Sequence, residues 1–248
     1  MKIVAIIPCR YGSERFQGKP LVPILGRPMI WWVYHRAKDA TILNDTVVAT
    51  DDERILHCVK DFGGKVLMTS SDHRSGTDRV AEAARLLKLN DDDIVINIQG
   101  DQPAFDSRCI DQVVGPLLGD RSLEMSTLVY RITNPNEISN PNNVKAIFDL
   151  MGYALYFSRS SIPYARDHSL QFDYYKHIGI YAYRKSFLER FISFPQGRLE
   201  KIEKLEQLRA LEHGHRIKVV ETTYDSVEID VAEDVEKAEN ALRKQGVA

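Results

Sequence analysis

The sequence predicts an α/β fold with a mostly parallel sheet and helices on both faces. Residues 3–7 (Ile-Val-Ala-Ile-Ile) form a short apolar run rich in β-branched residues, and comparable runs alternate with helical patterns as far as residue 98. Continuous apolar runs of this length are typical of strands that are buried on both faces of a parallel sheet. The alternation of strands and helices indicates a doubly wound arrangement.

The first part of the chain supplies most of this pattern. A strand at residues 3–7 is followed by a loop over 9–27 and by a helix over 28–37, because Pro28 is favourable in the first turn of a helix. The same reasoning predicts further strands at 46–50, 66–68 and 94–98 and helices at 53–62 and 77–87.

After about residue 120 the strands are separated by turns and no longer by helices. This change indicates an antiparallel insertion over residues 121–200, with strands at 125–132, 144–148, 154–158 and 176–184. Helices at 185–194 and 201–213, a strand at 217–221 and a helix at 232–243 complete the prediction. Because no repeat or linker interrupts the chain, we expect residues 1–248 to form a single domain.

The composition is that of an ordinary globular protein. The 248 residues include 33 Lys and Arg against 35 Asp and Glu, with a formal net charge of -2, and 44% of them are hydrophobic. A chain of this size can bury about 70% of the surface of its unfolded form. Because the charge is nearly balanced, the net charge of the protein does not attract polyphosphates. We therefore expect neither nucleic-acid nor anionic-membrane binding.

Neither membrane insertion nor a structural metal is expected. The apolar run at residues 3–7 is shorter than the ~18 residues of a membrane span or the ~7 to 15 of a signal-peptide core. Cys9, Cys58 and Cys109 are odd in number and far apart, without the paired spacing of a zinc site. We therefore expect a reducing, cytoplasmic location.

The loop after the first strand carries three cations, Arg10, Arg15 and Lys19. It lies at the carboxyl end of a buried strand, where open α/β sheets bind their ligands. At about 4 Å from a phosphate and an effective dielectric constant of about 20, each cation contributes ~4 kcal/mol before desolvation is subtracted. We interpret the loop as a triphosphate site, and the alternative is a solvated surface loop.

The spacing within this loop excludes a P-loop kinase. A Walker motif has about four residues between its glycines and a Ser or Thr directly after its lysine. Here five residues separate Gly12 from Gly18, and Pro20, which follows Lys19, has no hydroxyl for magnesium.

Seven ordered motifs resemble those of the 3-deoxy-manno-octulosonate cytidylyltransferases, the CMP-Kdo synthetases. They are Pro8-Cys-Arg10-x-x-Ser13-x-Arg15-x-x-x-Lys19-Pro20, Ala49-Thr-Asp-Asp52, Ser75-Gly-Thr-Asp-Arg79, Asn97-x-Gln-Gly-Asp101, Ala154-Leu-Tyr-Phe-Ser-Arg159-x-x-Ile-Pro163, His177-Ile-Gly-Ile-Tyr181 and Leu205-Glu-Gln-Leu-Arg209. The resemblance covers nearly the whole chain. It implies a nucleotide-diphospho-sugar transferase-like (Rossmann-like) fold with a mixed sheet.

The family that the chain resembles joins CTP to an eight-carbon acidic sugar and releases pyrophosphate. The resemblance therefore implies CTP and this sugar as partners, Mg2+ as cofactor, a homodimer, and a role in lipopolysaccharide synthesis. It also implies that residues 1–120 bind the nucleotide, whereas residues 121–200 bind the sugar and form the dimer.

Two aspartates are candidate metal ligands. Asp101 follows the strand at 94–98, so its carboxylate is expected at the same sheet edge as the cationic loop, where magnesium commonly takes carboxylates plus substrate phosphates. Asp230 matches the family's second metal carboxylate. From the sequence alone a helix cap is the favoured interpretation of Asp230, because Asp is a preferred capping residue, and the resemblance shifts the interpretation to metal binding.

The segment Ser75, Gly76, Thr77 and Arg79 precedes a helix and is a candidate nucleotide site. Ser75 or Thr77 is expected to cap this helix, yet the exposed N–H groups of the same terminus can bind anions or read the edge of a base. The resemblance implies that these four residues bind nucleotide together with Arg10, Ser13, Lys19 and Gln99. It implies catalytic roles for Arg10, Arg15, Lys19 and Asp101.

The sugar site is expected in the second half of the chain. An acidic sugar carries a carboxylate, for which the planar guanidinium of Arg159 or Arg166 is a suitable clamp. The resemblance adds four residues that would bond to sugar hydroxyls, namely His177, Tyr181, Glu206 and Gln207. The alternatives are core packing for His177 and Tyr181 and an exposed helical ion pair with Arg209 for Glu206.

The implied reaction is attack by the anomeric hydroxyl of the sugar on the α-phosphorus of CTP, with magnesium on Asp101 and Asp230. No protein general base is singled out. One alternative is another nucleotidyltransferase that uses a sugar 1-phosphate. A second alternative is a nucleotide-binding regulator without turnover.

Two departures from the commonest family pattern concern the substrate. Gln102 replaces a usual Glu, and Glu228 lies in a segment, Asp225-Ser-x-Glu228-x-Asp230, that is similar to a branch acting on the 8-amino analogue of the sugar. An acidic side chain near an ammonium group is physically sensible, because opposite charges stabilise each other. The sequence leaves open whether C8 carries a hydroxyl or an amine.

Overall fold

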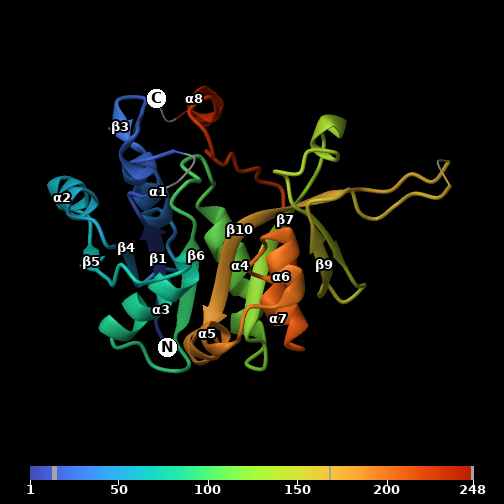
Figure 1. Cartoon of the computed structure of the whole chain (residues 1–248), viewed down its shortest axis with the longest axis horizontal. Coiled ribbons are helices and arrows are strands. Elements are labelled where there is room, and N and C mark those ends of the chain that lie inside the picture. Colours follow the sequence, from blue (N-terminus) through green and yellow to red (C-terminus); the bar gives the residue numbers. More distant parts are fainter. Residues whose placement is uncertain (13–15, 168, 247–248) are drawn as a thin grey trace.

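The computed structural model describes residues 1–12, 16–167 and 169–246, which fold around one mixed sheet (Figure 1). The central strands occur in the order β11-β7-β10-β6-β1-β4-β5. Their bounds are β1 Ile3–Cys9, β4 Asp45–Thr50, β5 Val66–Met68, β6 Ile94–Ile98, β7 Met125–Arg131, β10 Tyr175–Arg184 and β11 Lys218–Thr222.

One central strand runs against its neighbours. Strand β10 pairs antiparallel with β6 on one side and with β7 on the other, whereas β1, β4, β5 and β6 are parallel to one another and β11 is parallel to β7. Strands β8 (Lys145–Phe148) and β9 (Ala154–Ser158) form a hairpin that joins β10 at its edge. Strands β2 (Pro23–Ile24) and β3 (Arg27–Pro28) form a separate small hairpin.

Helices cover both faces of the sheet. The side chains of strand β1 point alternately to the two faces, so their contacts show which helices lie on each face. Ile3, Ala5 and Ile7 pack with helices α1, α2 and α4, whereas Val4 and Ile6 pack with α3, α5 and α7. The helices are α1 Met29–Lys38, α2 Glu53–Asp61, α3 Gly76–Leu86, α4 Arg108–Gly119, α5 Lys185–Ser193, α6 Arg198–Glu203, α7 Leu208–Glu212 and α8 Asp234–Lys244, with short 3-10 turns at Lys19–Leu21 and Pro135–Glu137.

The last helix crosses back to the first part of the chain. Ala238 and Leu242 of α8 pack with Ile24, Met29 and Trp32 in a third apolar cluster. Figure 1 shows α8 beside β3 and α1, which lie far from it in sequence. The segment between β11 and α8 is thereby drawn across the carboxyl ends of the central strands, and this segment carries Asp230.

The close contact between β1 and the end of β6 requires a glycine. A Cβ atom on Gly100 would lie 2.8 Å from Cys9 Sγ and 3.1 Å from the carbonyl oxygen of Pro8. Distances this short are repulsive, so only glycine lets the chain turn here without displacing β1. The turn brings Asp101, the next residue, to the carboxyl edge of the parallel strands.

The predicted fold class is confirmed, with three differences in detail. The expected helix at 201–213 is two short helices, α6 and α7, because Lys204 has a left-handed backbone (φ 55) that ends α6. Helix α4 was not predicted. The segments expected as an antiparallel insertion include β7 and β10, which are strands of the central sheet, so only β8, β9 and their flanking loops extend from it.

A long arm formed by the loop between β9 and β10 projects from the body (Figure 1). Its exposed apolar side chains are Tyr164, Leu170 and Phe172. A hollow of about 930 Å3 is lined by residues 163–167 and 169–172 of this arm. Among the described residues, no helix is both long enough and apolar enough to cross a membrane.

Candidate active site

A polar hollow of about 240 Å3 lies at the carboxyl ends of β1 and β6. Parallel strands end at the same edge of a sheet, and in open α/β folds this edge binds ligands. Six residues predicted for the nucleotide line it together with the predicted metal ligand Asp101, namely Arg10, Lys19, Ser75, Gly76, Arg79 and Gln99, whereas Thr77 does not. Ser13 and Arg15, which belong to the same prediction, lie outside the described residues.

Asp101 and Asp230 meet around one cation. The ammonium Nζ of Lys19 lies 2.7 Å from Asp101 Oδ2 and 3.9 Å from Asp230 Oδ1, and it donates to the carbonyl oxygen of Ile229 at 2.8 Å. The backbone N–H of Ile229 in turn donates to the carbonyl oxygen of Asp101 at 3.0 Å. These contacts fix the segment before α8 against the end of β6 and so bring the two carboxylates together.

The residues at this point fit a magnesium ion. A positive charge, the Lys19 ammonium, already lies between Asp101 and Asp230, and each carboxylate side chain keeps about a quarter of its surface exposed (27% and 25%). Oxygen donors of this kind are those that Mg2+ takes from proteins, with the remaining positions left to water and phosphate. Magnesium therefore remains a prediction that the donor set supports.

A third carboxylate, Glu228, lies beside the two aspartates. Its Oε1 accepts a 2.7 Å hydrogen bond from Gln102 Nε2. Burial in the cleft, together with the negative charges of Asp101 and Asp230, raises the pKa of Glu228 to about 7. The buried Oε1 of Gln102 has no hydrogen-bond partner among the described residues. The pair thus presents hydrogen-bond acceptors next to the two aspartates.

The N-terminus of α3 forms the opposite wall of the hollow. Ser75 Oγ accepts from the backbone N–H of Asp78, and Asp78 Oδ2 accepts from the backbone N–H of Ser75, both at 3.1 Å, which is a capping box. Capping and ligand binding coexist here, because Ser75 and Gly76 also line the hollow. The helix dipole adds positive potential at this end.

Arg79 is held by the protein itself. Its Nη2 donates to Asp51 Oδ2 at 2.7 Å and its Nη1 donates to Thr69 Oγ1 at 2.5 Å, and the residue is 4% exposed. Asp51 belongs to the Ala49–Asp52 motif, so this ion pair explains why both motifs occur together. Arg79 therefore lines the first hollow with its charge already paired with Asp51.

A second hollow of about 590 Å3 adjoins the first. Arg10, Arg74 and Ser75 line both, and Glu206 and Arg209 lie on the far wall of the second. Burial raises the pKa of Glu206, and the hydrogen bonds from Thr77 and Ser75 and the charge of Arg209 oppose this rise only in part. Arg74 was not singled out from the sequence; its position directly before Ser75, at a helix N-terminus that already suggested a phosphate site, was an available signal.

His177 and Tyr181 lie side by side on β10. The ring centroids are 5.2 Å apart, and His177 Nε2 is 2.8 Å from Thr127 Oγ1. Burial lowers the pKa of His177 to about 3 and raises the pKa of Tyr181 above its usual range. Both side chains are therefore neutral at physiological pH. Gln207, which directly follows Glu206 in the sequence, is buried, and its Nε2 has no hydrogen-bond partner among the described residues.

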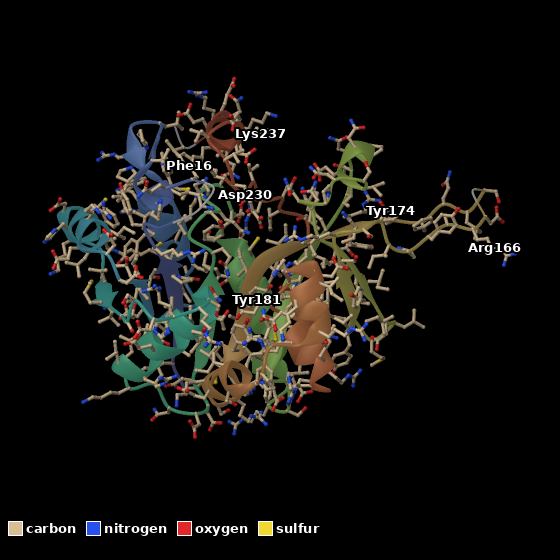
Figure 2. All side chains as sticks on the ribbon, in the orientation of Figure 1. Phe16, Arg166, Tyr174, Tyr181, Asp230 and Lys237 are labelled. Atoms are coloured by element: carbon tan, nitrogen blue, oxygen red, sulfur yellow. The ribbon has the colours of Figure 1, made fainter. Side chains whose placement is uncertain are left out.

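The two candidate arginines lie in different places. Arg159 is anchored at the base of the arm, where its Nε donates to the carbonyl oxygen of Glu203 at 2.8 Å and its Nη1 to that of Pro141 at 2.9 Å. Figure 2 shows Arg166 at the far end of the arm, well away from Asp230 and Tyr181. Within one chain, Arg166 is not brought together with the other predicted site residues.

A parallel α/β sheet with cations, two carboxylates and a helix N-terminus at its carboxyl edge is an arrangement suited to nucleotidyl transfer. A family model described as cytidylyltransferase matches residues 4–217. The chain therefore belongs to the cytidylyltransferase family, which makes it a nucleotidyltransferase and confirms the family expected from the motifs.

Individual relatives agree with this assignment. A 3-deoxy-manno-octulosonate cytidylyltransferase from Desulfatibacillum aliphaticivorans is 56% identical over 99% of this chain and 100% of its own length. An 8-amino-3,8-dideoxy-manno-octulosonate cytidylyltransferase from Shewanella sp. (strain ANA-3) is 54% identical over 98% of this chain and 99% of its own length. A solved CMP:2-keto-3-deoxy-manno-octonic acid synthetase complexed with CTP has a TM-score of 0.91 at 39% identity, covering 99% of this chain and 100% of that chain.

Proposed function

We propose that the protein transfers CMP from CTP to 3-deoxy-manno-octulosonate and releases pyrophosphate. The observation that carries this proposal is the meeting of Asp101 and Asp230 around Lys19 beside the nucleotide hollow. Attack by the anomeric hydroxyl forms a new oxygen–phosphorus bond at the α-phosphorus while the bond to the β-phosphate oxygen breaks. The product is a nucleotide-activated acidic sugar, which we further propose is used for lipopolysaccharide synthesis in the cytoplasm.

Arg10, Lys19 and the α3 N-terminus hold the triphosphate in this mechanism. Their positive charge stabilises the pyrophosphate as it leaves, and most of the rate comes from such positioning and charge stabilisation. Asp101 and Asp230 hold Mg2+, which would supply further positive charge to the phosphates and lower the pKa of the attacking hydroxyl. Cys9 is no nucleophile, because burial raises the pKa of its thiol to about 12.

Arg159, Glu206, Gln207, His177 and Tyr181 form the sugar side of the site in this proposal. The neutral His177 and Tyr181 can exchange hydrogen bonds with hydroxyls without adding charge, and the orphaned amide nitrogen of Gln207 has a donor to offer. The guanidinium of Arg159 suits the carboxylate of the sugar. Arg166 would reach a site only in a second copy of the chain.

The 8-amino analogue of the sugar is a second candidate substrate, and one observation favours it. Glu228 accepts one hydrogen bond, from Gln102 Nε2, and keeps further acceptor capacity, while Gln102 Oε1 has no partner among the described residues. A protonated amine would satisfy both better than a hydroxyl, because it brings a positive charge and three donors.

A pyrophosphate-release assay separates these candidates. CTP is supplied with 3-deoxy-manno-octulosonate, with its 8-amino analogue, with a sugar 1-phosphate, or without any sugar. We expect pyrophosphate release with 3-deoxy-manno-octulosonate. If Glu228 and Gln102 bind an amine, kcat/KM is expected to be higher with the 8-amino analogue. Release with neither acidic sugar contradicts the proposal, and equal release with ATP contradicts the assignment of the hollow to a pyrimidine.

We also propose that the protein is a homodimer in which the arm packs against a second copy. The exposed apolar side chains of the arm, Leu170 and Phe172 among them, support this proposal, because single chains rarely keep such surface in water. Sedimentation equilibrium of Phe172→Asp should give a monomer where the parent gives a dimer. Leu118→Asp, which changes an exposed leucine of α4, is the matched control and should remain dimeric.

A further inference from the structure

A buried polar network connects the nucleotide wall of the site to the sugar wall. Glu206, two residues before α7, accepts a 2.6 Å hydrogen bond on Oε2 from Thr77 Oγ1, in the first turn of α3. Its Oε1 accepts from Arg209 Nη2 at 3.3 Å. The two carboxylate oxygens of Glu206 are thus held from opposite sides by residues of two different helices.

The Thr77 hydroxyl has no proton left to donate to a nucleotide. Its hydroxyl proton is donated to Glu206, and its oxygen accepts from Asn97 Nδ2 at 3.2 Å. The residue is only 2% exposed, whereas its neighbours Ser75 and Gly76 line the nucleotide hollow. A hydroxyl has one proton to donate, so donation from Thr77 to a phosphate or to an acceptor atom of a base would break the bond to Glu206.

Arg209 holds the other side of Glu206 firmly. Its Nε and Nη2 donate to Glu200 Oε2 and Oε1 at 2.8 and 2.6 Å, and Arg209 and Glu200 are 8% and 4% exposed. A bidentate pair of this kind fixes the guanidinium in one orientation. Glu206 therefore has a fixed donor on each oxygen, and the 28% of its side chain that stays exposed faces the second hollow.

We propose that Thr77 is a positioning residue for Glu206 and acts on the sugar half of the reaction, although it lies in the nucleotide motif. This inference rests on the proposed function. A carboxylate has about four acceptor sites, so after the bonds from Thr77, Arg209 and the Ser75 hydroxyl about one remains for the sugar hydroxyls. Without the Thr77 hydroxyl the carboxylate is free to turn away from the orientation that those hydroxyls need.

The test compares CTP binding with sugar kinetics in Thr77→Val, which keeps the shape of the side chain and removes its hydroxyl. We expect the KM for the sugar to rise about tenfold while the dissociation constant for CTP, measured by calorimetry, changes less than twofold. A tenfold change corresponds to about 1.4 kcal/mol, within the range for a hydrogen bond to a charged group. Thr77→Ser, which restores the hydroxyl, should restore the KM.

Two further variants distinguish positioning from a general loss of packing. In a Glu206→Ala background, Thr77→Val should add less than a twofold effect, because the acceptor that Thr77 positions is already gone. Thr46→Val, at another buried threonine on β4, is the matched control and should leave both constants unchanged. If the effects of the two substitutions on the sugar KM multiply in the double variant, the inference is overturned. Weaker CTP binding of Thr77→Val with an unchanged sugar KM would overturn it as well.

A crystal structure of Thr77→Val gives a readout that does not depend on turnover. We expect the Glu206 carboxylate to leave its observed orientation, and an unmoved Glu206 overturns the inference. If the parent protein releases no pyrophosphate with either sugar, the proposed function fails, while this structural comparison still decides whether Thr77 positions Glu206.

Discussion

Lys19 lies at the point where the charges of the site converge. Its ammonium contacts Asp101, approaches Asp230 and donates to the backbone of Ile229. One cation among three carboxylates, with Glu228 as the third, leaves an excess of negative charge, which adds to desolvation in raising the pKa of Glu228. The site is therefore prepared for additional positive charge before any phosphate arrives.

Replacing Asp101 by Asn tests this arrangement. The amide keeps the size of the side chain and removes its charge, so we expect kcat to fall at least about a hundredfold at all practical magnesium concentrations while the fold is kept. Pyrophosphate release and circular dichroism measure the two effects. Asp92→Asn, at an exposed aspartate before β6 on the opposite edge of the sheet, is the control. Activity of Asp101→Asn within about threefold of the parent would place the metal elsewhere.

His177 gives a prediction for stability against pH. Burial lowers its pKa from 6.5 to about 3, so between these values the unfolded chain binds a proton that the folded protein does not. Stability contributed by the neutral side chain is therefore complete above about pH 6.5 and is lost as the pH falls, by at most about 1.4 kcal/mol per pH unit. Urea unfolding of the parent and of His177→Gln from pH 7.5 to 4.5 measures it.

The variant should lose less stability than the parent over this range, because the remaining groups titrate alike in both proteins. Parallel curves for the parent and His177→Gln would show that His177 is protonated in the folded protein. The same neutrality explains how His177 lies beside Tyr181 in the interior without a counter-charge.

At the scale of elements, the site depends on how closely β6 approaches β1 at the end of the sheet. Gly100→Ala would place a methyl group against Cys9 Sγ and the Pro8 carbonyl, and we expect a loss of about 1–3 kcal/mol of stability in urea unfolding. Gly119→Ala, at the end of α4, meets nothing within 4 Å and should stabilise by up to about 1 kcal/mol. Equal effects of both substitutions would refute the close-contact argument.

At the scale of the whole molecule, the proposed function assigns the nucleotide to the first part of the chain and the sugar to the second. Arg159→Ala should raise the KM for the acidic sugar roughly tenfold and leave CTP binding intact, because its guanidinium would bond to the sugar carboxylate. CTP calorimetry and the sugar dependence of pyrophosphate release check this. Loss of CTP affinity with an intact sugar dependence would show that Arg159 belongs to the nucleotide.

Arg166→Ala should affect sugar kinetics only in the dimer, because this residue lies at the tip of the arm within one chain (Figure 2). Sugar KM is measured for Arg166→Ala alone and in combination with Phe172→Asp. An effect of Arg166→Ala that persists in the monomeric double variant would contradict a role across the interface.

The sequence by itself predicted the parallel half of the sheet and the ligand edge. Ile3 to Ile7 reads as a buried strand from composition alone, and parallel strands must end at one edge, so Lys19 and Asp101 could be placed there. Helix α3 and its cap were also predictable, because the capping box of Ser75 and Asp78 is a local signal within four residues.

Only the tertiary structure decided which distant residues meet. Asp230 reaches Asp101 because α8 packs on α1 and β2, and Arg166 lies apart because the arm projects from the body. The break at Lys204 was equally hidden, since no glycine or proline marks its left-handed backbone. The physical reason is common to all three: each depends on long-range packing, whereas propensities and caps act over a few neighbouring residues.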